Sequence, residues 1–226
     1  MTIKTYAEII QGSEEWFAIR CGILTASQVG LVLTPTLKPA NNDKSRANLY
    51  ELLAQRITKY VEPSYVSDDM LRGQDDEIYA RDIYSKEYAP VDQVGFITND
   101  QWGFTLGFSP DGLVGDDGFI EIKSRRQKFQ IQTIIDGVMD QDFALQIQTG
   151  FVVTGRKWCD FISYCGGLPM ITIRVYPDPK TMDAIVEAAG MFEATLATRL
   201  AEYNDRLATN PRLVPTERRI YTEMFV

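Results

Sequence analysis

FTLGFSPDGLVGDDGFIEIKSRRQK, residues 104–128, is the stretch that decides the expected fold. An apolar run leads into the tetrapeptide SPDG, and the DDG that follows at 116–118 is typical of a hairpin turn. The next segment, FIEIK, alternates apolar and charged side chains, so on a strand Glu121 and Lys123 point to one face. A folded hairpin then brings Asp111 next to Glu121.

These residue types suit hydrolysis at a metal ion. The carboxylates of Asp111 and Glu121 and the backbone carbonyl of Ile122 are hard oxygen ligands, which Mg²⁺ accepts while it keeps several waters. Lys123 could orient or deprotonate the attacking water, provided that its pKa falls below the free value of about 10.4. A surface hairpin with a Glu/Lys pair would share the bare pattern, because so short a motif often arises by chance. The complete run of SPDG, turn and FIEIK favours a nuclease.

The composition is that of one soluble globular domain spanning residues 1–226, a length that can bury a substantial core. Apolar residues make up 45% of the chain and charged residues 24%, which is ordinary for such a domain. We find no apolar run of membrane-spanning length and no signal-peptide pattern, so we expect a cytoplasmic protein that contacts no membrane. Two prolines within residues 210–226 indicate an extended tail.

The chain contains no histidine and only three cysteines. The first absence excludes Ser-His-Asp and Cys-His catalysis and every histidine-ligated metal site. Three cysteines cannot alone supply the four ligands that an iron–sulfur cluster usually needs. Hydrolysis by this chain must therefore use carboxylates, lysine and a hard metal.

The net charge of −8 counts against nucleic acid, because phosphate contacts need Lys and Arg. An acidic enzyme with a small or neutral substrate would have the same balance. Basic residues nevertheless gather in KSRRQK, residues 123–128, so Arg125 and Arg126 are candidate DNA contacts in a locally positive channel.

A second candidate site lies near the start of the chain. Ser13 and two acidic residues predict a helix that runs to about Arg20 and stops at Gly22, and Thr25 or Ser27 then caps a short helix. An arginine, two hydroxyls and the N–H groups of a helix start can bind an anion. Ordinary capping beside a surface arginine is the competing interpretation.

The remaining pattern predicts alternating helices and strands, and hence an α/β fold with a mixed central sheet flanked by helices. In the helix expected at 67–88 we predict a buried face made of Met70, Leu71, Ile78 and Ile83. The other helices are expected at 45–60, 129–136, 141–154 and 179–207, and the strands at 91–99, 102–108, 158–164 and 170–176.

Taken together, the motifs resemble those of the PD-(D/E)XK nucleases, and within them the phage-lambda-type 5′→3′ exonucleases of the YqaJ group, which are related to the RecB nuclease domain. The resemblance covers residues 16–148 and is carried by five blocks in family order. These are Trp16 with RCGILTAS at 20–27, Arg72-Gly73 with Glu77, SPDG at 109–112, EIK at 121–123, and QIQ at 146–148.

The resemblance implies a restriction-endonuclease-like core and roles for individual residues. Asp111, Glu121 and Lys123 would be catalytic, with Asp111, Glu121 and Ile122 as metal ligands. Glu77 would be a further ligand of a metal or of its water, and Gln148, ahead of Gln146, would contact a phosphate or the attacking water. A pocket for the 5′-terminal phosphate would combine Arg20, Thr25, Ser27 and Ser109.

The implied activity is removal of 5′-mononucleotides from one strand of a linear duplex, beginning at a 5′-phosphorylated end and leaving a 3′ single strand for recombination. Two Mg²⁺ ions per site are implied, with Mn²⁺ as the alternative. The resemblance further implies a homotrimeric ring around DNA, a single-strand annealing protein as partner, and a phage or prophage gene expressed in a bacterial host. A structure- or sequence-specific endonuclease on the same fold and a non-catalytic DNA-binding recombination partner are the alternatives.

Overall fold

The computed structural model describes residues 2–63 and 67–218, and in these ranges its strands form two four-stranded sheets. The first sheet has the order β1-β3-β4-β2, and the second the order β5-β6-β7-β8. The strands are β1 (Ile3–Tyr6), β2 (Leu24–Thr25), β3 (Phe96–Asn99), β4 (Leu106–Phe108), β5 (Gly112–Val114), β6 (Gly118–Ser124), β7 (Trp158–Tyr164) and β8 (Ile171–Val175).

Each sheet contains one parallel pair, β2 with β4 and β6 with β7, and its other pairs are antiparallel. The expected mixed α/β class is therefore confirmed. The strands divide between two sheets, however, where we expected one central sheet. The division falls between β4, which pairs with β2 and β3, and β5, which pairs with β6, and no local pattern encodes it.

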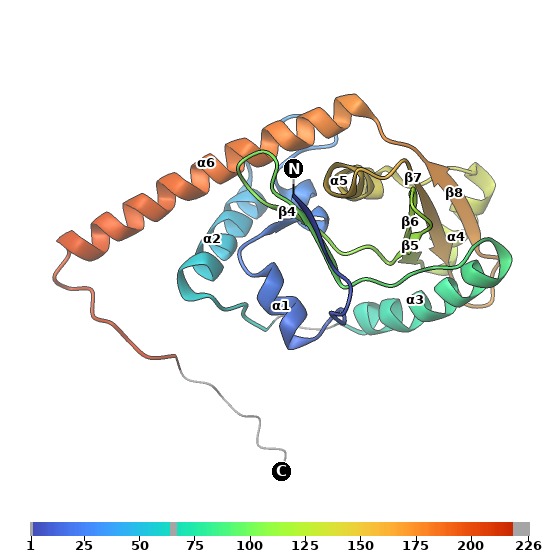
Figure 1. Cartoon of the computed structure of the whole chain (residues 1–226), viewed down its shortest axis with the longest axis horizontal. Helices are drawn as coiled ribbons and strands as arrows, with labels where there is room; N and C mark the ends of the chain where they lie inside the picture. Colours follow the sequence, from blue (N-terminus) through green and yellow to red (C-terminus); the bar gives the residue numbers. More distant parts are fainter. Residues whose placement is uncertain (1, 64–66, 219–226) are drawn as a thin grey trace, which may run out of the picture.

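The helices cover both sheets and fill the space between them (Figure 1). α5 packs against β3, β4 and the long helix α6 and is buried along most of its length. The helical segments are α1 (Glu14–Arg20), η1 (Ala26–Leu31), α2 (Asp43–Thr58), α3 (Asp68–Glu87), α4 (Gln127–Asp136), η2 (Gln141–Phe143), α5 (Ala144–Thr154) and α6 (Pro179–Thr209), of which η1 and η2 are 3₁₀ turns.

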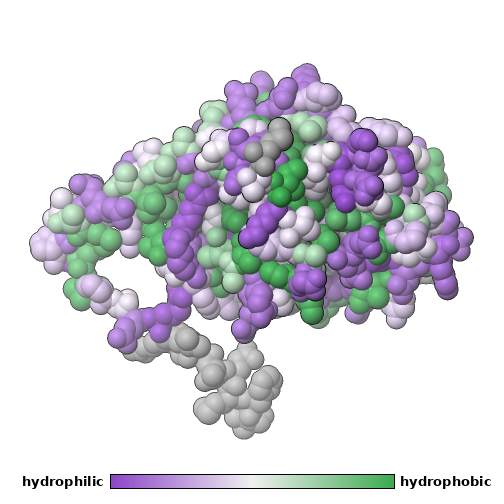
Figure 2. Space-filling model, viewed as in Figure 1, coloured by the Kyte–Doolittle hydropathy of each residue, from purple (hydrophilic) through white to green (hydrophobic). Residues whose placement is uncertain are grey.

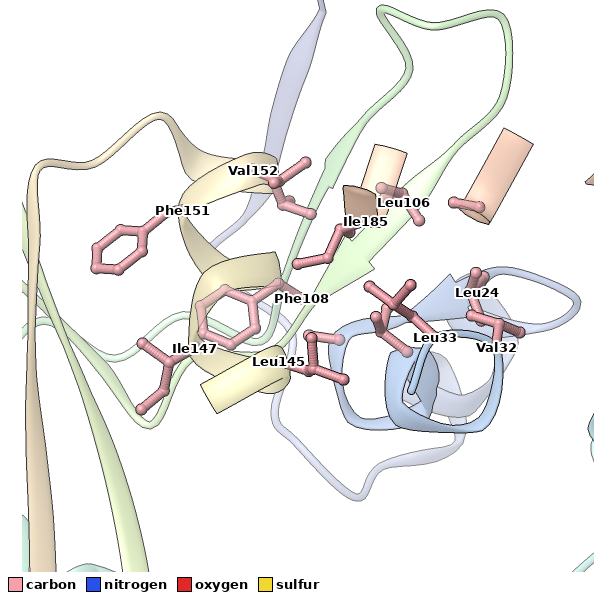
Figure 3. Packing of buried hydrophobic residues seen from close by; sticks show 14 of the residues in the cluster. Leu24, Val32, Leu33, Leu106, Phe108, Leu145, Ile147, Phe151, Val152 and Ile185 are labelled. Atoms are coloured by element: carbon pink, nitrogen blue, oxygen red, sulfur yellow. The ribbon is translucent and has the colours of Figure 1, made fainter. Parts of the chain in front are cut away.

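Aromatic side chains join the two sheets in the main core (Figure 3). Phe108 on β4 packs edge-on against Phe119 on β6, with ring centroids 5.2 Å apart, and Phe119 packs against Phe151 of α5 at 5.0 Å. Gly150 lies against the first two rings, because a Cβ there would come within 2.8 Å of Phe119. The close packing of Phe108 and Phe119 therefore holds the segment between β4 and β5 in place.

The expected buried face of α3 is wrong. Met70, Leu71, Ile78 and Ile83 are all exposed, by 39–55%, and the helix instead buries Ala80 and Tyr84. The small Ala80 lets the helix approach the second sheet, and the Tyr84 hydroxyl donates to Asp160 of β7 at 2.6 Å. The Ala80 and Tyr84 face therefore packs on β6 of the hairpin, and Glu77 and Arg81 lie on the same side of the helix.

The long helix α6 packs its apolar stripe on the core only as far as Leu196 and Leu200, and its last turns leave the body of the molecule (Figure 1). Apolar side chains on this free end are exposed, as the hydropathy surface shows (Figure 2). The expected tail at 210–226 is exposed from Asn210 to Arg218, and residues 219–226 lie outside the described part. None of the helices in the described ranges has the length and hydropathy needed to cross a bilayer.

Candidate active site

The hairpin β5–β6 builds the site as the sequence predicts. Gly112 pairs with Ile120 in the antiparallel register, which places Asp111 beside Glu121. Gly112 is required here, because a Cβ would lie 2.1 Å from Cγ1 of Val91. A bridge between Asp92 and Leu113 holds the same segment against the start of β5.

The alternation of β6 sorts its side chains between two environments. Ile120 and Ile122 are buried in a small apolar cluster with Ala80 and Tyr84 of α3. Glu121, 1% exposed, and the ammonium-bearing Lys123 point to the other face. The apolar face therefore anchors the strand while the charged face lines the site.

Asp111, Glu121 and Lys123 converge. The N–H of Ile122 donates to Oδ2 of Asp111 at 2.5 Å, and Nζ of Lys123 lies 2.6 Å from Oε1 of Glu121. Gln146 of α5 joins them, because its amide N–H donates to Oε1 of Glu121 at 2.5 Å and its oxygen accepts from Lys123 at 3.2 Å. Glu121, Lys123 and Gln146 thus share one network of side-chain contacts, and Asp111 is fixed beside it by the backbone of Ile122.

Gln148 is placed differently from the expectation. Its amide donates to the carbonyl of Tyr176 at 2.9 Å and its oxygen accepts from the N–H of Asp178 at 2.8 Å. Both ends of the side chain thus bind the connection between β8 and α6. Of the two glutamines, Gln146 is the one that contacts the site.

Glu77 lies near the acids, but its carboxylate binds Arg81, one helical turn further along α3. Arg81 also donates from Nε to the backbone carbonyl of Asp111 at 2.8 Å. The sequence analysis missed Arg81. The spacing of four residues between Glu77 and Arg81, typical of an ion pair on a helix, could have found it.

The packing of these acids raises their pKa values. Burial, together with Asp111 and Glu77, raises the pKa of Glu121 to about 8 against the opposing effect of Lys123. Burial and Asp111 raise the pKa of Glu77 to about 7, and burial raises that of Asp111. Buried acids of like charge that resist ionisation are typical of functional sites.

The expectation of a lowered Lys123 pKa is not met among the protein's own groups. Burial acts to lower this pKa, but the neighbouring Glu121 and Asp111 outweigh it and raise it. Lys123 is therefore a cation here, suited to holding a water or phosphate oxygen. Deprotonation of Lys123 would need further positive charge close by.

The donor atoms fit a hard cation. Oε2 of Glu121 is buried and has no hydrogen-bond partner, which leaves an oxygen ready to ligate an ion beside Asp111. Within residues 2–63 and 67–218, no three His, Cys, Asp or Glu side chains are close enough to hold one metal together. An ion at this arrangement would take its remaining ligands from backbone, water or substrate, as Mg²⁺ does. The carbonyl of Ile122 as a ligand stays a prediction.

The anion site predicted near the start of the chain contacts the segment before the hairpin at Ser109. Arg20 donates to the Ser109 hydroxyl at 2.9 Å, and the indole N–H of Trp16 donates to the same oxygen at 3.0 Å. The Arg20 guanidinium also stacks 3.7 Å from the Trp16 ring. Burial lowers the Arg20 pKa to about 10, so the group keeps its charge at neutral pH.

Thr25 and Ser27 form the other half of the expected pocket. Their hydroxyls lie 3.2 Å apart, and Thr25 caps η1 together with Gln28. Because β2 runs parallel to β4 with Thr25 opposite Gly107, Ser27 and Ser109 leave the first sheet at the same end. The topology thus brings all four predicted residues to the same end of the sheet. Arg20 contacts Ser109 and Thr25 contacts Ser27, and the two pairs do not hydrogen-bond to each other.

Arg125 and Arg126 bind acids of the protein itself. Arg125 pairs with Asp140 at 3.0 Å and Arg126 with Asp69 at 2.9 Å. Both line an open groove of about 400 Å³ beside the end of β6. A role in DNA contact, which would require these pairs to open, stays a prediction.

Comparison with known proteins agrees with this geometry. A model of the YqaJ-like viral recombinase domain matches residues 15–157. The crystal structure of an alkaline exonuclease, LHK-Exo, from Laribacter hongkongensis is 34% identical, with 87% of this chain and 98% of that chain covered and a TM-score of 0.77. LHK-Exo in complex with dAMP gives 35% identity and a TM-score of 0.78 over the same shares.

A phage related exonuclease from Haemophilus somnus 129PT shares the fold at 11% identity, with a TM-score of 0.54 over 79% of this chain and 96% of that chain. No curated protein sequence matches the chain. The expected PD-(D/E)XK core is confirmed by these structural neighbours. The family match spans well over half of the residues, and LHK-Exo is similar along 87% of them, so the chain belongs to the YqaJ-like viral recombinase domain family.

Proposed function

We propose that the protein is a magnesium-dependent 5′→3′ exonuclease that degrades one strand of linear double-stranded DNA. The observation that carries the proposal is that one hairpin brings Asp111, Glu121 and Lys123 together, with the buried Oε2 of Glu121 left without a hydrogen-bond partner. The similarity to an alkaline exonuclease supports the reaction class. The complex of that relative with dAMP, a deoxynucleoside monophosphate, supports mononucleotides as products.

Asp111, Glu121 and the Ile122 carbonyl would hold the metal, with Glu77 as the further acid. Two Mg²⁺ ions, or Mn²⁺ in their place, supply positive charge that stabilises the attacking and leaving oxygens of a phosphodiester. Lys123 orients the attacking water by its ammonium group. Gln146 fixes Lys123 and Glu121 relative to each other through its two hydrogen bonds.

The Arg20 and Ser109 pair explains why cleavage would start at an end. Together with Thr25 and Ser27, it would hold a 5′-terminal phosphate by charge-assisted hydrogen bonds. A terminal phosphate held at a fixed distance from Asp111 sets the cut one nucleotide inward. The released mononucleotide leaves a new 5′-phosphate, so the same step repeats in the 5′→3′ direction.

The biological setting follows from the family. We infer a phage or prophage enzyme that acts in the cytoplasm of a bacterial host and leaves a 3′ single strand for a single-strand annealing protein. Assembly as a homotrimer around the duplex belongs to the same proposal. Equilibrium sedimentation of the protein with and without DNA measures the assembly.

Digestion of an end-labelled linear duplex tests the function. With Mg²⁺, a 5′ label should appear at once as mononucleotide, whereas a 3′ label should stay in long single strands. A 5′-phosphorylated duplex should be degraded faster than the same duplex with 5′-hydroxyl ends. Rapid nicking of covalently closed circles would instead identify an endonuclease, and absence of any cleavage would favour a non-catalytic DNA-binding partner.

A further inference from the structure

Arg81 contacts both Glu77 and Asp111, and no other residue in the described ranges hydrogen-bonds to both. It binds the Glu77 carboxylate within α3 and donates to the Asp111 carbonyl at 2.8 Å. A third contact, from Nη1 to the side-chain oxygen of Gln93 at 2.9 Å, ties it to the segment before β3. The Arg81 side chain is only 12% exposed, and its contacts with Glu77 and Asp111 are partly buried, whereas the contact with Gln93 lies at the surface.

The charges of the site are matched pair by pair. Lys123 forms an ion pair with Glu121, and Arg81 forms one with Glu77. The Asp111 carboxylate accepts a hydrogen bond from the N–H of Ile122. Three acids thus face two bases. One divalent ion beside Asp111 and Glu121 is compatible with this balance. A second ion that used Glu77 as a ligand would find that carboxylate already bound to Arg81.

We propose that Arg81 is a positioning residue that occupies the place of a cation at Glu77, and that a second divalent ion must compete with it for that carboxylate. This inference rests on the proposed metal-dependent function and adds a determinant of metal affinity to it. A guanidinium offers five N–H donors in a rigid planar fork, so Arg81 holds both Glu77 and the Asp111 backbone in place until an ion competes for the carboxylate.

The trade-off has a physical direction. Removing Arg81 frees Glu77 for an ion, which favours binding, but also releases the Asp111 carbonyl from α3, which loosens the site. A residue with a merely structural role would only weaken metal binding when it is replaced. Replacing a residue that competes with the ion would instead strengthen metal binding.

The test is a double-mutant cycle on metal affinity, measured without DNA. Mn²⁺ binding to the full chain is followed by the electron paramagnetic resonance of the free ion in the wild type, Arg81→Gln, Glu77→Gln and the double variant. We expect Arg81→Gln to bind the second, more weakly held Mn²⁺ ion about tenfold more tightly than the wild type does. Residue pairs in contact couple by about 0.5–3 kcal/mol. In the Glu77→Gln background the same change should have a much smaller effect, and this comparison removes the general effect of deleting one positive charge.

Arg81→Lys provides a second variant that keeps the charge but loses the planar fork. Its Mn²⁺ affinity should lie between those of the wild type and Arg81→Gln, and circular dichroism confirms that each variant is folded. Equal affinities in the wild type and Arg81→Gln, weaker binding in Arg81→Gln, or an equal gain in both backgrounds would each overturn the inference. If the four proteins show the predicted cycle but the wild type digests no DNA, the proposed function is refuted and the role of Arg81 stands.

Discussion

Gln146 and Glu121 are joined by a hydrogen bond of 2.5 Å between the amide of the first and Oε1 of the second. Lys123 contacts both residues, so the three side chains form a closed triangle across β6 and α5. The triangle fixes the orientation of the carboxylate that carries the unpartnered buried oxygen. Helix α5 is thereby part of the site and not only of the core.

Replacement of Gln146 by Ala should therefore lower the rate of digestion. The substitution removes the bond that orients Glu121 and one partner of Lys123, and loss of such a supporting contact reduces activity by about 10–100-fold. Single-turnover release of label from a 5′-phosphorylated duplex, with saturating Mg²⁺, measures the effect. Gln148→Ala, two residues further along α5, is the matched control: it should lower the melting temperature while its turnover stays near that of the wild type. The reverse pattern would restore Gln148 as the site glutamine.

Asp111→Asn should abolish metal-dependent cleavage without unfolding the protein. Asn keeps the size of the side chain and can still accept from the Ile122 N–H, but it removes the negative charge that would bind the ion. We expect a loss on the order of 10³-fold or more, since a metal stabilises the transition state by several kcal/mol. Mononucleotide release measures activity and a thermal melt measures folding. Undiminished release would place the metal elsewhere.

Arg20→Ala should erase the preference for a phosphorylated 5′ end. The substitution deletes the cation that contacts Ser109, so the two kinds of end become nearly equivalent. Charged hydrogen bonds contribute about 1.5–3 kcal/mol, which corresponds to a loss of about 10–100-fold on the phosphorylated duplex only. Parallel digestion of 5′-phosphoryl and 5′-hydroxyl duplexes gives the ratio. A uniform loss on both duplexes would indicate a structural role for Arg20.

The stability of the protein without divalent ions should fall as the pH rises from 6 to 9. The folded pKa of Glu121, about 8, lies above its ordinary value of 4.5, so the folded state binds the extra proton between these values. Its contribution to stability is complete below pH 4.5 and is lost as the pH passes through 8, and Glu77, with a pKa of about 7, acts in the same direction. Melting temperatures in EDTA measure this slope.

Mg²⁺ should reverse that slope, because the metal and the proton compete for the same carboxylates. The increase in melting temperature on adding Mg²⁺ should be larger at pH 9 than at pH 6. Glu121→Gln cannot ionise, so it should show a shallower pH dependence in EDTA and a smaller gain from Mg²⁺. An increase that is independent of pH would contradict the assignment of these acids as ligands.

Two glycines should respond in opposite ways to alanine. A Cβ at Gly73, in the interior of α3, would meet nothing within 4 Å, so Gly73→Ala should stabilise the protein by about 0.5–1 kcal/mol through helix propensity. Gly112→Ala would place its methyl group 2.1 Å from Val91 and should destabilise the hairpin. Urea unfolding of both variants gives the two free energies of unfolding. A destabilised Gly73→Ala would show that α3 tolerates no side chain there.

The hairpin was predictable because its information is local. The DDG turn and the period-two alternation of FIEIK determine which side chains share a face, and the observed register agrees. The capped helix at Glu14–Arg20 followed from Ser13 and its acidic neighbours in the same way, and Ser13 does accept from the N–H of Trp16. Short-range chemistry alone accounts for these elements.

The missed features depend on contacts between distant segments. Helix α3 carries apolar residues on several sides, so periodicity could not reveal that Ala80 and Tyr84 face the sheet. Helix α5 is buried almost all round, and hence the family pattern, which favoured Gln148 over Gln146, did not reveal which glutamine faces the site. The edge strand β1 was not anticipated, because its four residues are nearly all exposed and it is defined by pairing with β3.

Pro110 separates two residues that are assigned to different parts of the proposed site. Ser109, bound by Arg20, and Asp111, bound by the N–H of Ile122, are separated by this single residue, whose ring locks one of its two backbone torsions. Two trans peptide units span at most about 7 Å, so Ser109 and Asp111 cannot move further apart than this. In the proposed reaction, the length of the Ser109-Pro110-Asp111 segment would set the size of the fragment removed in each cycle. Lengthening this segment by one residue should change the product from mononucleotides to longer pieces.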